Sequence, residues 1–253
     1  SGYIKRNPLS LYKYQNRGGK GITGVKNIEE DFVSNLYVAS TLDTFLFFTN
    51  HGKVFWRKVY QIPLAGRIAR GKAIVNLLNL ADGERVAAIL PVSSLDVENS
   101  DKTIMMVTSS GRIKKTDMQE FRRPLRRGKK ALTINEGDEI IAAHILSGNS
   151  SILLYTQKGM CIHFHEDDIR SMGRAAAGAR GIRLVGDDKV VSAIVVSSDH
   201  SVLTVTENGY GKRTDESAYR CQGRGGKGII NIVVNERNGK VVGVCHVTGN
   251  SEI

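Results

Sequence analysis

The sequence predicts an all-β domain of the propeller class, built from successive four-stranded units. The first observation behind this prediction is a repeat, in which an apolar run ending in Thr is followed by two variable residues and a Gly. The repeated Gly stands at positions 2, 52, 111, 159 and 209, at intervals of 50, 59, 48 and 50 residues. The second is the content of 27 Gly against 4 Pro, which is typical of many tight turns. Periods of this length indicate blades or solenoid units, which bury an apolar face only against a neighbour.

The Thr-ended run is the expected first strand of each unit. It occurs as TFLFFT before Gly52, TIMMVT before Gly111, SILLYT before Gly159 and SVLTVT before Gly209. For Gly2 the corresponding strand would precede the first residue. The long second interval reflects a polar insertion at 93–102.

Three further strands complete each expected unit, as in the second one, where they fall at 53–59, 73–78 and 85–92. Short β-branched runs bounded by Gly, Asn and Asp are hairpin signals, and these runs are too short and too rich in Val and Ile for helices. The closing strand recurs at 139–146, 189–196 and 240–247, and 32–40 takes that position in the first unit.

These repeats predict one domain over 1–253. The expected units are roughly 1–40, 41–93, 101–147, 150–197 and 199–248, with the start of a sixth at 249–253. Because the sixth signature Gly would lie beyond Ile253, we expect a fragment of a longer protein whose ring is closed by a sixth blade.

The composition excludes several classes of protein. There is no apolar run of about 18 residues for a membrane-spanning helix and no apolar segment of a signal peptide at the N-terminus. Cys161, Cys221 and Cys245 lack CxxC spacing, which favours a reducing compartment. The 36 Lys and Arg against 25 Asp and Glu give a net charge of +11, which is compatible with a polyanionic partner.

A loop that combines Gly with Arg or Lys follows the second strand of every unit. The five copies are QNRGGKG (15–21), GRIARGK (66–72), RPLRRGK (123–129), AAAGARG (175–181) and QGRGGKG (222–228). Equivalent points of a propeller lie around one rim, so these loops predict a basic belt. Gly allows close approach of the backbone to a partner, and Arg and Lys supply charge for phosphates. The richest segment, 111–130, has nine basic residues against Asp117 and Glu120.

The belt supplies the candidate DNA-binding residues outside the first loop. They are Arg67, Arg70, Lys72, Arg122, Arg123, Arg126, Arg127, Lys129, Lys130, Arg174, Arg180, Arg224 and Lys227. A single basic loop is usually a solvated surface. Recurrence in all five units favours binding instead, and sparse aromatic residues favour a duplex read through its backbone over single strands. A propeller scaffold for an acidic protein stays an alternative, although such a scaffold would more often offer aromatic anchors.

No catalytic, metal or cofactor site is expected. RGGKG lacks the Ser or Thr and the following helix of a P-loop, and the βαβ context of a dinucleotide site is missing. Cys161, His163 and His165 alternate on one strand and share a face, which is weak evidence for zinc because no second cluster accompanies them. No combination of residues suggests a catalytic triad or a carboxylate pair.

In its four-stranded repeats and its basic loops, the chain resembles the C-terminal domain of the DNA gyrase A subunit over essentially its whole length. The resemblance is carried by GYIKRNPLSLYKYQNRGGKG, by KVYQIP with RGKAIVNLL, by RGIRL, and by ENGYGKRT with ERNGKVVGV. The family's hallmark, the gyrase A box, has the pattern QRRGGKG. It is matched by Gln15, Arg17, Gly18, Gly19, Lys20 and Gly21. Asn16 departs from the pattern and removes one charge, and Gln222 to Gly228 is a near-copy.

This resemblance implies a six-bladed β-pinwheel, a propeller variant in which neighbouring blades exchange a strand, with its sixth blade incomplete in this chain. It implies that duplex DNA wraps positively around the basic rim, through which gyrase introduces negative supercoils. The implied partners are double-stranded DNA and, in an A2B2 enzyme, the gyrase B subunit together with the rest of the gyrase A polypeptide. The implied location is the bacterial cytoplasm, at the nucleoid.

The resemblance also implies that the domain is not an enzyme by itself. The nucleophilic Tyr, the Mg²⁺ site and the ATP site of this ATP-dependent type II topoisomerase lie elsewhere, so no cofactor is expected here. The alternative within the same fold is the C-terminal domain of topoisomerase IV, which has a similar ring without an intact box.

Overall fold

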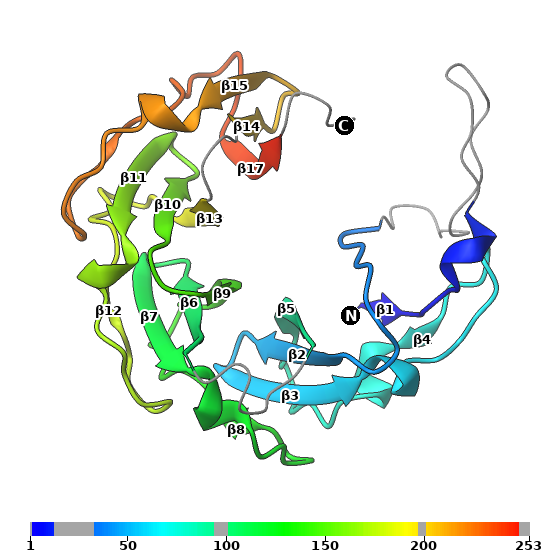
Figure 1. Ribbon diagram of the computed structural model, residues 1–253. Helices are drawn as coiled ribbons and strands as arrows, with labels where there is room; N and C mark the ends of the chain where they lie inside the picture. The colour runs from blue at the N-terminus through cyan, green and yellow to red at the C-terminus, as the bar shows by residue number, and fades with distance from the viewer. Residues whose placement is uncertain (1, 13–32, 94–100, 197–200, 248–253) are drawn as a thin grey trace.

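The computed structural model describes residues 2–12, 33–93, 101–196 and 201–247. These residues form five β-sheets arranged around an open arc, with the first and last sheets on either side of the opening (Figure 1). Only strands, short 3-10 turns and loops occur in the described ranges. None of the helices found there is long and apolar enough to cross a membrane.

The second unit shows the pattern of a complete sheet. Its strand order is β5-β2-β3-β8, all antiparallel. The strands are β2 (Thr44–Thr49), β3 (Lys53–Lys58), β5 (Val86–Val92) and β8 (Lys129–Lys130).

The other sheets repeat this order or part of it. Two complete sheets are β9-β6-β7-β12 and β13-β10-β11-β16, a three-stranded sheet is β17-β14-β15, and a two-stranded sheet pairs β1 with β4. Their bounds are β1 (Tyr3–Ile4), β4 (Lys72–Ala73), β6 (Thr103–Thr108), β7 (Arg112–Asp117), β9 (Ile140–Leu146), β10 (Ser151–Thr156), β11 (Met160–His165), β12 (Ala179–Arg180), β13 (Val190–Val196), β14 (Ser201–Thr206), β15 (Gly211–Asp215), β16 (Ile229–Ile230) and β17 (Val241–Val247). The prediction of an all-β, propeller-like fold is confirmed; the expected start of a sixth unit at 249–253 lies outside the described residues.

The fourth strand of each complete sheet comes from the following unit. β8 lies between β7 and β9 of the third unit yet pairs with β3 of the second, and β12 and β16 pair in the same way with β7 and β11. This exchange links neighbouring blades, as in the β-pinwheel that the resemblance implied.

The expected strand at 73–78 is therefore mostly wrong. Only Lys72 and Ala73 form a strand, β4, and they pair with β1 of the preceding unit. Ile74–Asn76 is a 3-10 turn, in which Leu77 N–H donates to Ile74 O at 2.9 Å, and Ile74 and Leu78 are buried in the core.

The expected closing strands agree with β5, β9, β13 and β17 to within one residue. The exception is 32–40 in the first unit, whose described residues, 33–40, form no strand. In units two to five the closing strand pairs with the first strand of its own unit. Tyr37 packs on the core instead, and its hydroxyl donates to Ile89 O at 3.2 Å.

The core lies between adjacent sheets, and the first strands of units two, three and four, β2, β6 and β10, contribute to apolar clusters on both faces. All six residues of β2 are buried. Phe45 and Phe47 belong to one apolar cluster, whereas Leu46 and Phe48 belong to the next, together with Ile104 of β6. Because both faces of such a strand are buried, successive residues are apolar, which explains sequences such as TFLFFT.

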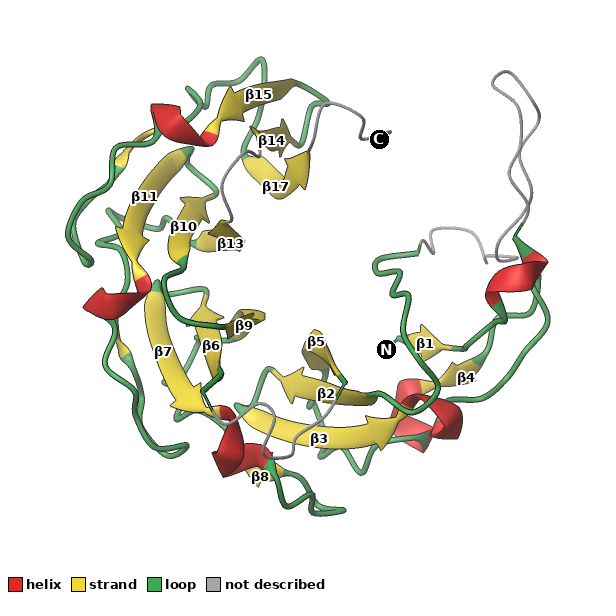
Figure 2. Cartoon of the chain, in the orientation of Figure 1, coloured by secondary structure: helices red, strands yellow, loops and turns green. Residues whose placement is uncertain are grey.

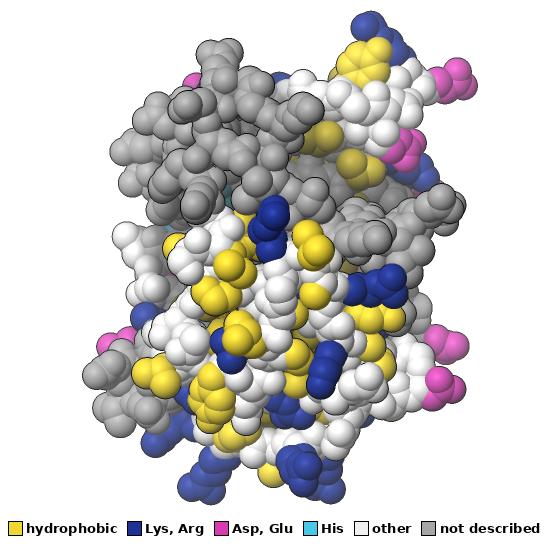
Figure 3. Space-filling model, turned by 90° about the vertical axis from the view of Figure 1, so that its right-hand side faces the viewer, with side chains coloured by type: hydrophobic (Ala, Val, Ile, Leu, Met, Phe, Trp, Pro, Cys, Tyr) yellow, Lys and Arg dark blue, Asp and Glu magenta, His cyan; other side chains and the backbone are white. Residues whose placement is uncertain are grey.

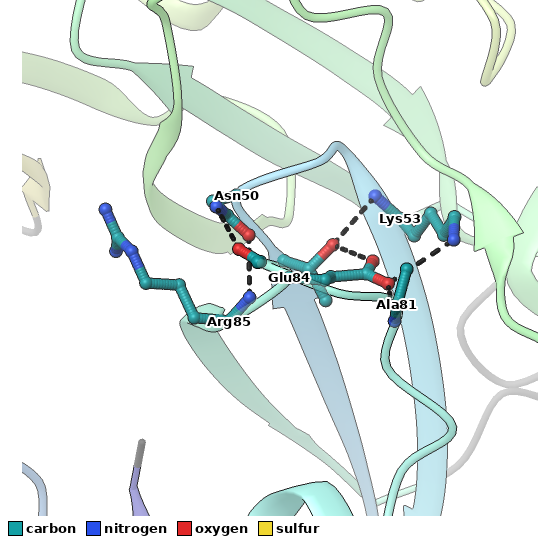
Figure 4. A network of polar contacts seen from close by, with 7 residues as sticks. Asn50, Lys53, Ala81, Glu84 and Arg85 are labelled. Atoms are coloured by element: carbon teal, nitrogen blue, oxygen red, sulfur yellow. Dashed lines mark hydrogen bonds and ion pairs between the residues drawn. The ribbon is translucent and has the colours of Figure 1, made fainter.

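The Thr of the repeat is explained by a buried turn. Thr49 Oγ1 donates to Glu84 Oε1 at 2.7 Å, and Glu84 also accepts from Ala81 N–H at 2.8 Å and from Lys53 Nζ at 3.3 Å (Figure 4). Asn50 joins the same turn by accepting from Arg85 N–H at 2.7 Å. These bonds fasten the turn after β2 to the start of β5.

The same turn recurs in the next two units with Asp in place of Glu. Asp138 accepts from Ser109 Oγ and from Ser110 N–H, both at 2.9 Å. Asp188 accepts from Lys158 N–H at 3.0 Å. A buried or half-buried acid two residues before the closing strand is therefore a repeated structural feature.

Candidate nucleic-acid interface

The basic loops of units two to five, here called rim loops, are residues 62–71, 122–128, 170–178 and 220–228. Each leads from the 3-10 turn after a unit's second strand to the exchanged strand on the preceding sheet. The 3-10 turns lie along the outer edge of the arc (Figure 2). The first basic loop, Gln15 to Gly21, lies outside the described residues.

Most of the predicted rim cations in the described loops are exposed. The exposed set is Arg70, Lys72, Arg122, Arg123, Arg126, Arg127, Lys130, Arg180 and Lys227. Five of these nine belong to the third unit, so the described part of the belt is densest there. Figure 3 shows Lys and Arg side chains interspersed with apolar ones on the face formed by the first units.

Arg174 and Arg224 are half-buried, and each binds the 3-10 turn and the exchanged strand that flank the preceding rim loop. Arg174 Nε donates to Glu120 Oε2 at 3.2 Å, and its Nη1 donates to Lys130 O at 3.2 Å. Arg224 repeats the arrangement one unit later by donating to Asp168 O at 3.0 Å and to Arg180 O. These two side chains thus connect their own rim loops to the segments on either side of the preceding loop, and part of their hydrogen-bonding capacity is already used.

Arg67 and Lys129 are the other half-buried members of the predicted set. Lys129 Nζ lies 5.8 Å from the centre of the Trp56 ring, in a cation–π arrangement. Burial, followed by the nearby Arg174 and Arg123 guanidinium groups, lowers the pKa of Lys129. The Lys129 ammonium group is therefore in contact with the Trp56 ring as well as being part of the rim.

Lys114 is one of the nine basic residues of 111–130, yet it is fully buried. Its Nζ donates to Ala131 O at 2.6 Å, Arg174 O at 2.7 Å and Gly173 O at 3.0 Å. Burial, with the nearby Arg174 guanidinium, lowers the pKa of Lys114 to about 8. The ammonium group contacts the rim loop of the next unit from inside.

The structure adds two exposed cations that sequence reasoning missed, Arg170 and Arg220. Each directly follows a buried residue at the end of a 3-10 turn, Ile169 and Tyr219, just as Arg122 follows Phe121. The signal is present as an apolar residue followed by Arg at the same point of three units. Arg170 and Arg220 were missed because they precede the Gly-containing motifs by which the loops were located in the sequence.

Cys161, His163 and His165, whose alternation gave weak evidence for zinc, do not form a set of metal ligands. Cys161 and His163 are buried, and His163 Nδ1 lies 2.8 Å from Tyr219 O. His165 pairs instead with Asp167, at 3.1 Å. In the ranges that the structure describes, no group of three His, Cys, Asp or Glu side chains is placed to hold a metal ion.

The sequence matches the family of the DNA gyrase C-terminal domain, a β-propeller, over residues 1–40, 43–93, 102–147, 150–197 and 200–244. Similar curated proteins include the gyrase A polypeptides of Salmonella typhimurium, with 47% identity over 252 residues, and of Escherichia coli K12, with 45% over 252 residues. Both comparisons cover 100% of this chain but only 28% of the relative, so the chain spans a minor part of these proteins.

Two solved structures have the same fold over 98% of this chain. The C-terminal domain of DNA topoisomerase IV superimposes with a TM-score of 0.78 at 22% identity and is covered over 75% of its length. A DNA gyrase A C-terminal domain superimposes with a TM-score of 0.76 at 25% identity and is covered over 80%.

Proposed function

Because this chain belongs to the family of DNA gyrase C-terminal domains, we propose that it binds duplex DNA without sequence specificity and bends it around the rim. The wrap is positive, and within the whole enzyme it enables negative supercoiling. The observation that carries the proposal is the recurrence of exposed cations in successive rim loops along one outer edge. Phosphate contacts of this kind hold the backbone and read no bases.

The energetics of bending favour such a distributed surface. Bending 20–30 bp of DNA by 40–90° costs roughly 1–6 kcal/mol, so a long wrap requires contacts at many points. Single exposed charges contribute little each, and the repeat supplies several per blade. Histones likewise wrap DNA without base-specific contacts.

In this proposal the domain is a non-catalytic part of an ATP-dependent type II topoisomerase. Its partners are duplex DNA, the gyrase B subunit, and the remainder of the gyrase A polypeptide, in the bacterial cytoplasm at the nucleoid. The gyrase A relatives at 47% identity over the whole chain support gyrase over topoisomerase IV, whose domain shares the fold at 22% identity. Gln15 to Gly21 and the exposed rim residues are the proposed contacts.

The salt dependence of duplex binding tests the proposal. We expect log K to fall against log[salt] with a slope of at least about −5, since each neutralised phosphate contributes about −0.9. Fluorescence anisotropy of a labelled duplex between low and moderate salt measures this slope. A slope near −1 would contradict a belt of contacts.

A pair of charge-matched variants shows where the contacts lie. Replacing Arg126 and Arg127 by Ala should reduce the slope by about 2, because two phosphate contacts are lost. Replacing Lys189 and Lys240, which are exposed but precede the closing strands, removes the same charge away from the rim loops. An equal reduction of the slope in both variants would indicate a general effect of net charge and would contradict specific contacts at the rim loops.

A further inference from the structure

The rim loop of the fourth unit is folded around a buried cation. Three backbone carbonyls of this loop, from Gly173, Arg174 and Ala176, lie 3.0, 2.7 and 3.4 Å from Lys114 Nζ. Ala131 O of the third unit is the fourth oxygen, at 2.6 Å. No carboxylate within the described residues forms an ion pair with Lys114, so carbonyl dipoles are the direct partners of its positive charge.

The second unit has the same arrangement. Lys5 stands at the position of Lys114, three residues after the signature Gly, and its Nζ donates to Gly66 O at 3.2 Å and to Arg67 O. A backbone bond inside the loop is also repeated, since Ala69 N–H donates to Gly66 O and Ala176 N–H donates to Gly173 O, both at 3.1 Å. The two loops therefore share one turn, whose carbonyls face an inner ammonium group.

This conformation directs a set of backbone N–H groups outward. In a trans peptide the N–H points away from the C=O of the same unit. The peptides whose carbonyls face Lys114 carry the N–H groups of Arg174, Ala175 and Ala177. No backbone carbonyl of the described residues accepts from these three, and Ala175 is exposed. Converging backbone N–H groups form anion-binding sites in proteins.

We propose that the rim loop 173–178 is a phosphate site in which the N–H groups of Arg174 and Ala175 bind one backbone phosphate of a nucleic acid, with Lys114 as the inner counter-charge. Loop 66–71 is the equivalent site over Lys5. The proposal rests on the proposed function for the source of the phosphate. It explains why a loop with Ala at 175, 176 and 177 belongs to a basic belt.

Other units provide internal comparisons. The equivalent of Lys114 is Phe55 in the second unit and Ile162 in the fourth, both fully buried, so the loops over them lack an inner charge. In the fifth unit Lys212 is equivalent, but its Nζ donates to Asn231 O at 2.8 Å and contacts no rim loop among the described residues. Lys212→Met is therefore a matched control for Lys114→Met.

The test is an amide NMR titration of the 253-residue chain. With a short DNA duplex, we expect the amide resonances of Arg174 and Ala175 to shift with saturation, together with those of Arg67 and Ile68. Inorganic phosphate should shift the same amides at higher concentration. Lys114→Met should abolish the response at Arg174 and Ala175 and lower duplex affinity about three- to tenfold, the worth of roughly one net hydrogen bond. Lys212→Met should leave both amide responses intact.

Several outcomes would overturn the site. Unshifted Arg174 and Ala175 amides, while other rim residues respond to the duplex, would disprove it and leave the proposed function standing. An unchanged response in Lys114→Met would remove the role of the ammonium. A response to inorganic phosphate without one to duplex would reject nucleic acid as the ligand. Absence of any duplex binding by the wild-type chain would instead refute the proposed function. The wild-type titration by itself shows whether the Arg174 and Ala175 amides bind the duplex, even if Lys114→Met fails to fold.

Discussion

At the scale of residues, the same positions of the repeat hold the same chemistry in successive units. A buried or half-buried acid closes the turn in units two, three and four, at Glu84, Asp138 and Asp188. Burial by itself would raise the pKa of Glu84. The N–H of Ala81, the hydroxyl of Thr49 and the ammonium of Lys53 outweigh it and lower that pKa below its usual value. The ionised form is thus the one that the fold stabilises.

Glu84→Gln should lower the free energy of unfolding by about 1–3 kcal/mol at neutral pH, since the amide cannot accept all three hydrogen bonds. A carboxyl group whose folded pKa is depressed stabilises the fold above its unfolded value, and the effect is lost as the pH falls through the folded value. The difference between wild type and variant should therefore shrink below pH 4.5, the ordinary value. Urea unfolding at several pH values measures it.

The control for this prediction is Glu139→Gln. Glu139 forms an exposed ion pair with Arg85, and such pairs are worth about 0–1 kcal/mol. If Glu84→Gln and Glu139→Gln cost the same, the buried turn has no special role.

At the scale of elements, two-residue strands hold neighbouring units together. β16 pairs Ile229 with Cys161 and Ile230 with Met160. Gly228, just before it, has φ +77°, and an added Cβ would lie 2.2 Å from Cys161 O. The exchanged strand thus approaches the preceding sheet so closely that only Gly fits.

Gly228→Ala should destabilise the chain by more than Gly137→Ala. Both residues have positive φ, which costs an Ala about 1–2 kcal/mol. The added Cβ at Gly137 meets no atom within 4 Å, whereas at Gly228 it overlaps a backbone oxygen that side-chain motion cannot relieve. Urea unfolding of both variants measures the difference in the free energy of unfolding. Equal losses of stability would show that the exchanged strand can move away from Cys161 O without an energetic cost.

At the scale of the whole molecule, the open arc brings the rim loops to one outer edge. Arg174 and Arg224 link the rim loops of units four and five to the exchanged strands that follow the preceding loops, at Lys130 O and Arg180 O. These hydrogen bonds hold neighbouring rim loops at fixed distances from each other. Fixed distances between cations suit duplex DNA, whose phosphates are regularly spaced. In the proposed function, this arrangement distributes the DNA contacts over several loops.

Replacing residues 15–21 by Ala should abolish the linking-number change that the proposed wrap is expected to produce on relaxed, then ligated plasmid, while most duplex affinity remains. The loop contributes only two cations, Arg17 and Lys20, but three closely spaced Gly, which indicates a role in holding the end of the wrap. The Arg126→Ala/Arg127→Ala variant removes equal charge and should retain a linking-number change. Circular dichroism checks the fold. A normal linking-number change in the box variant would leave only a general basic belt.

Local patterns in the sequence were enough to establish the class of fold, the positions of most strands and the family. The β-branched runs before Gly52 and Gly111 indicate strands because their residue types and turn signals are adjacent in the chain. The motif at Gln15 to Gly21 carries the family in the same way. The basic loops could also be located, because charge and Gly recur at a fixed period.

The pairing of each short strand and the exposure of each cation depend on the tertiary structure. Lys72 and Ala73 look like the start of a strand of their own unit, but their partners, Ile4 and Tyr3, are distant in sequence. Lys114 and Arg122 are both basic residues of one segment, yet one is enclosed by carbonyls of the next unit and the other is exposed. Burial depends on contacts between units, and no local pattern of charge or hydropathy records those contacts.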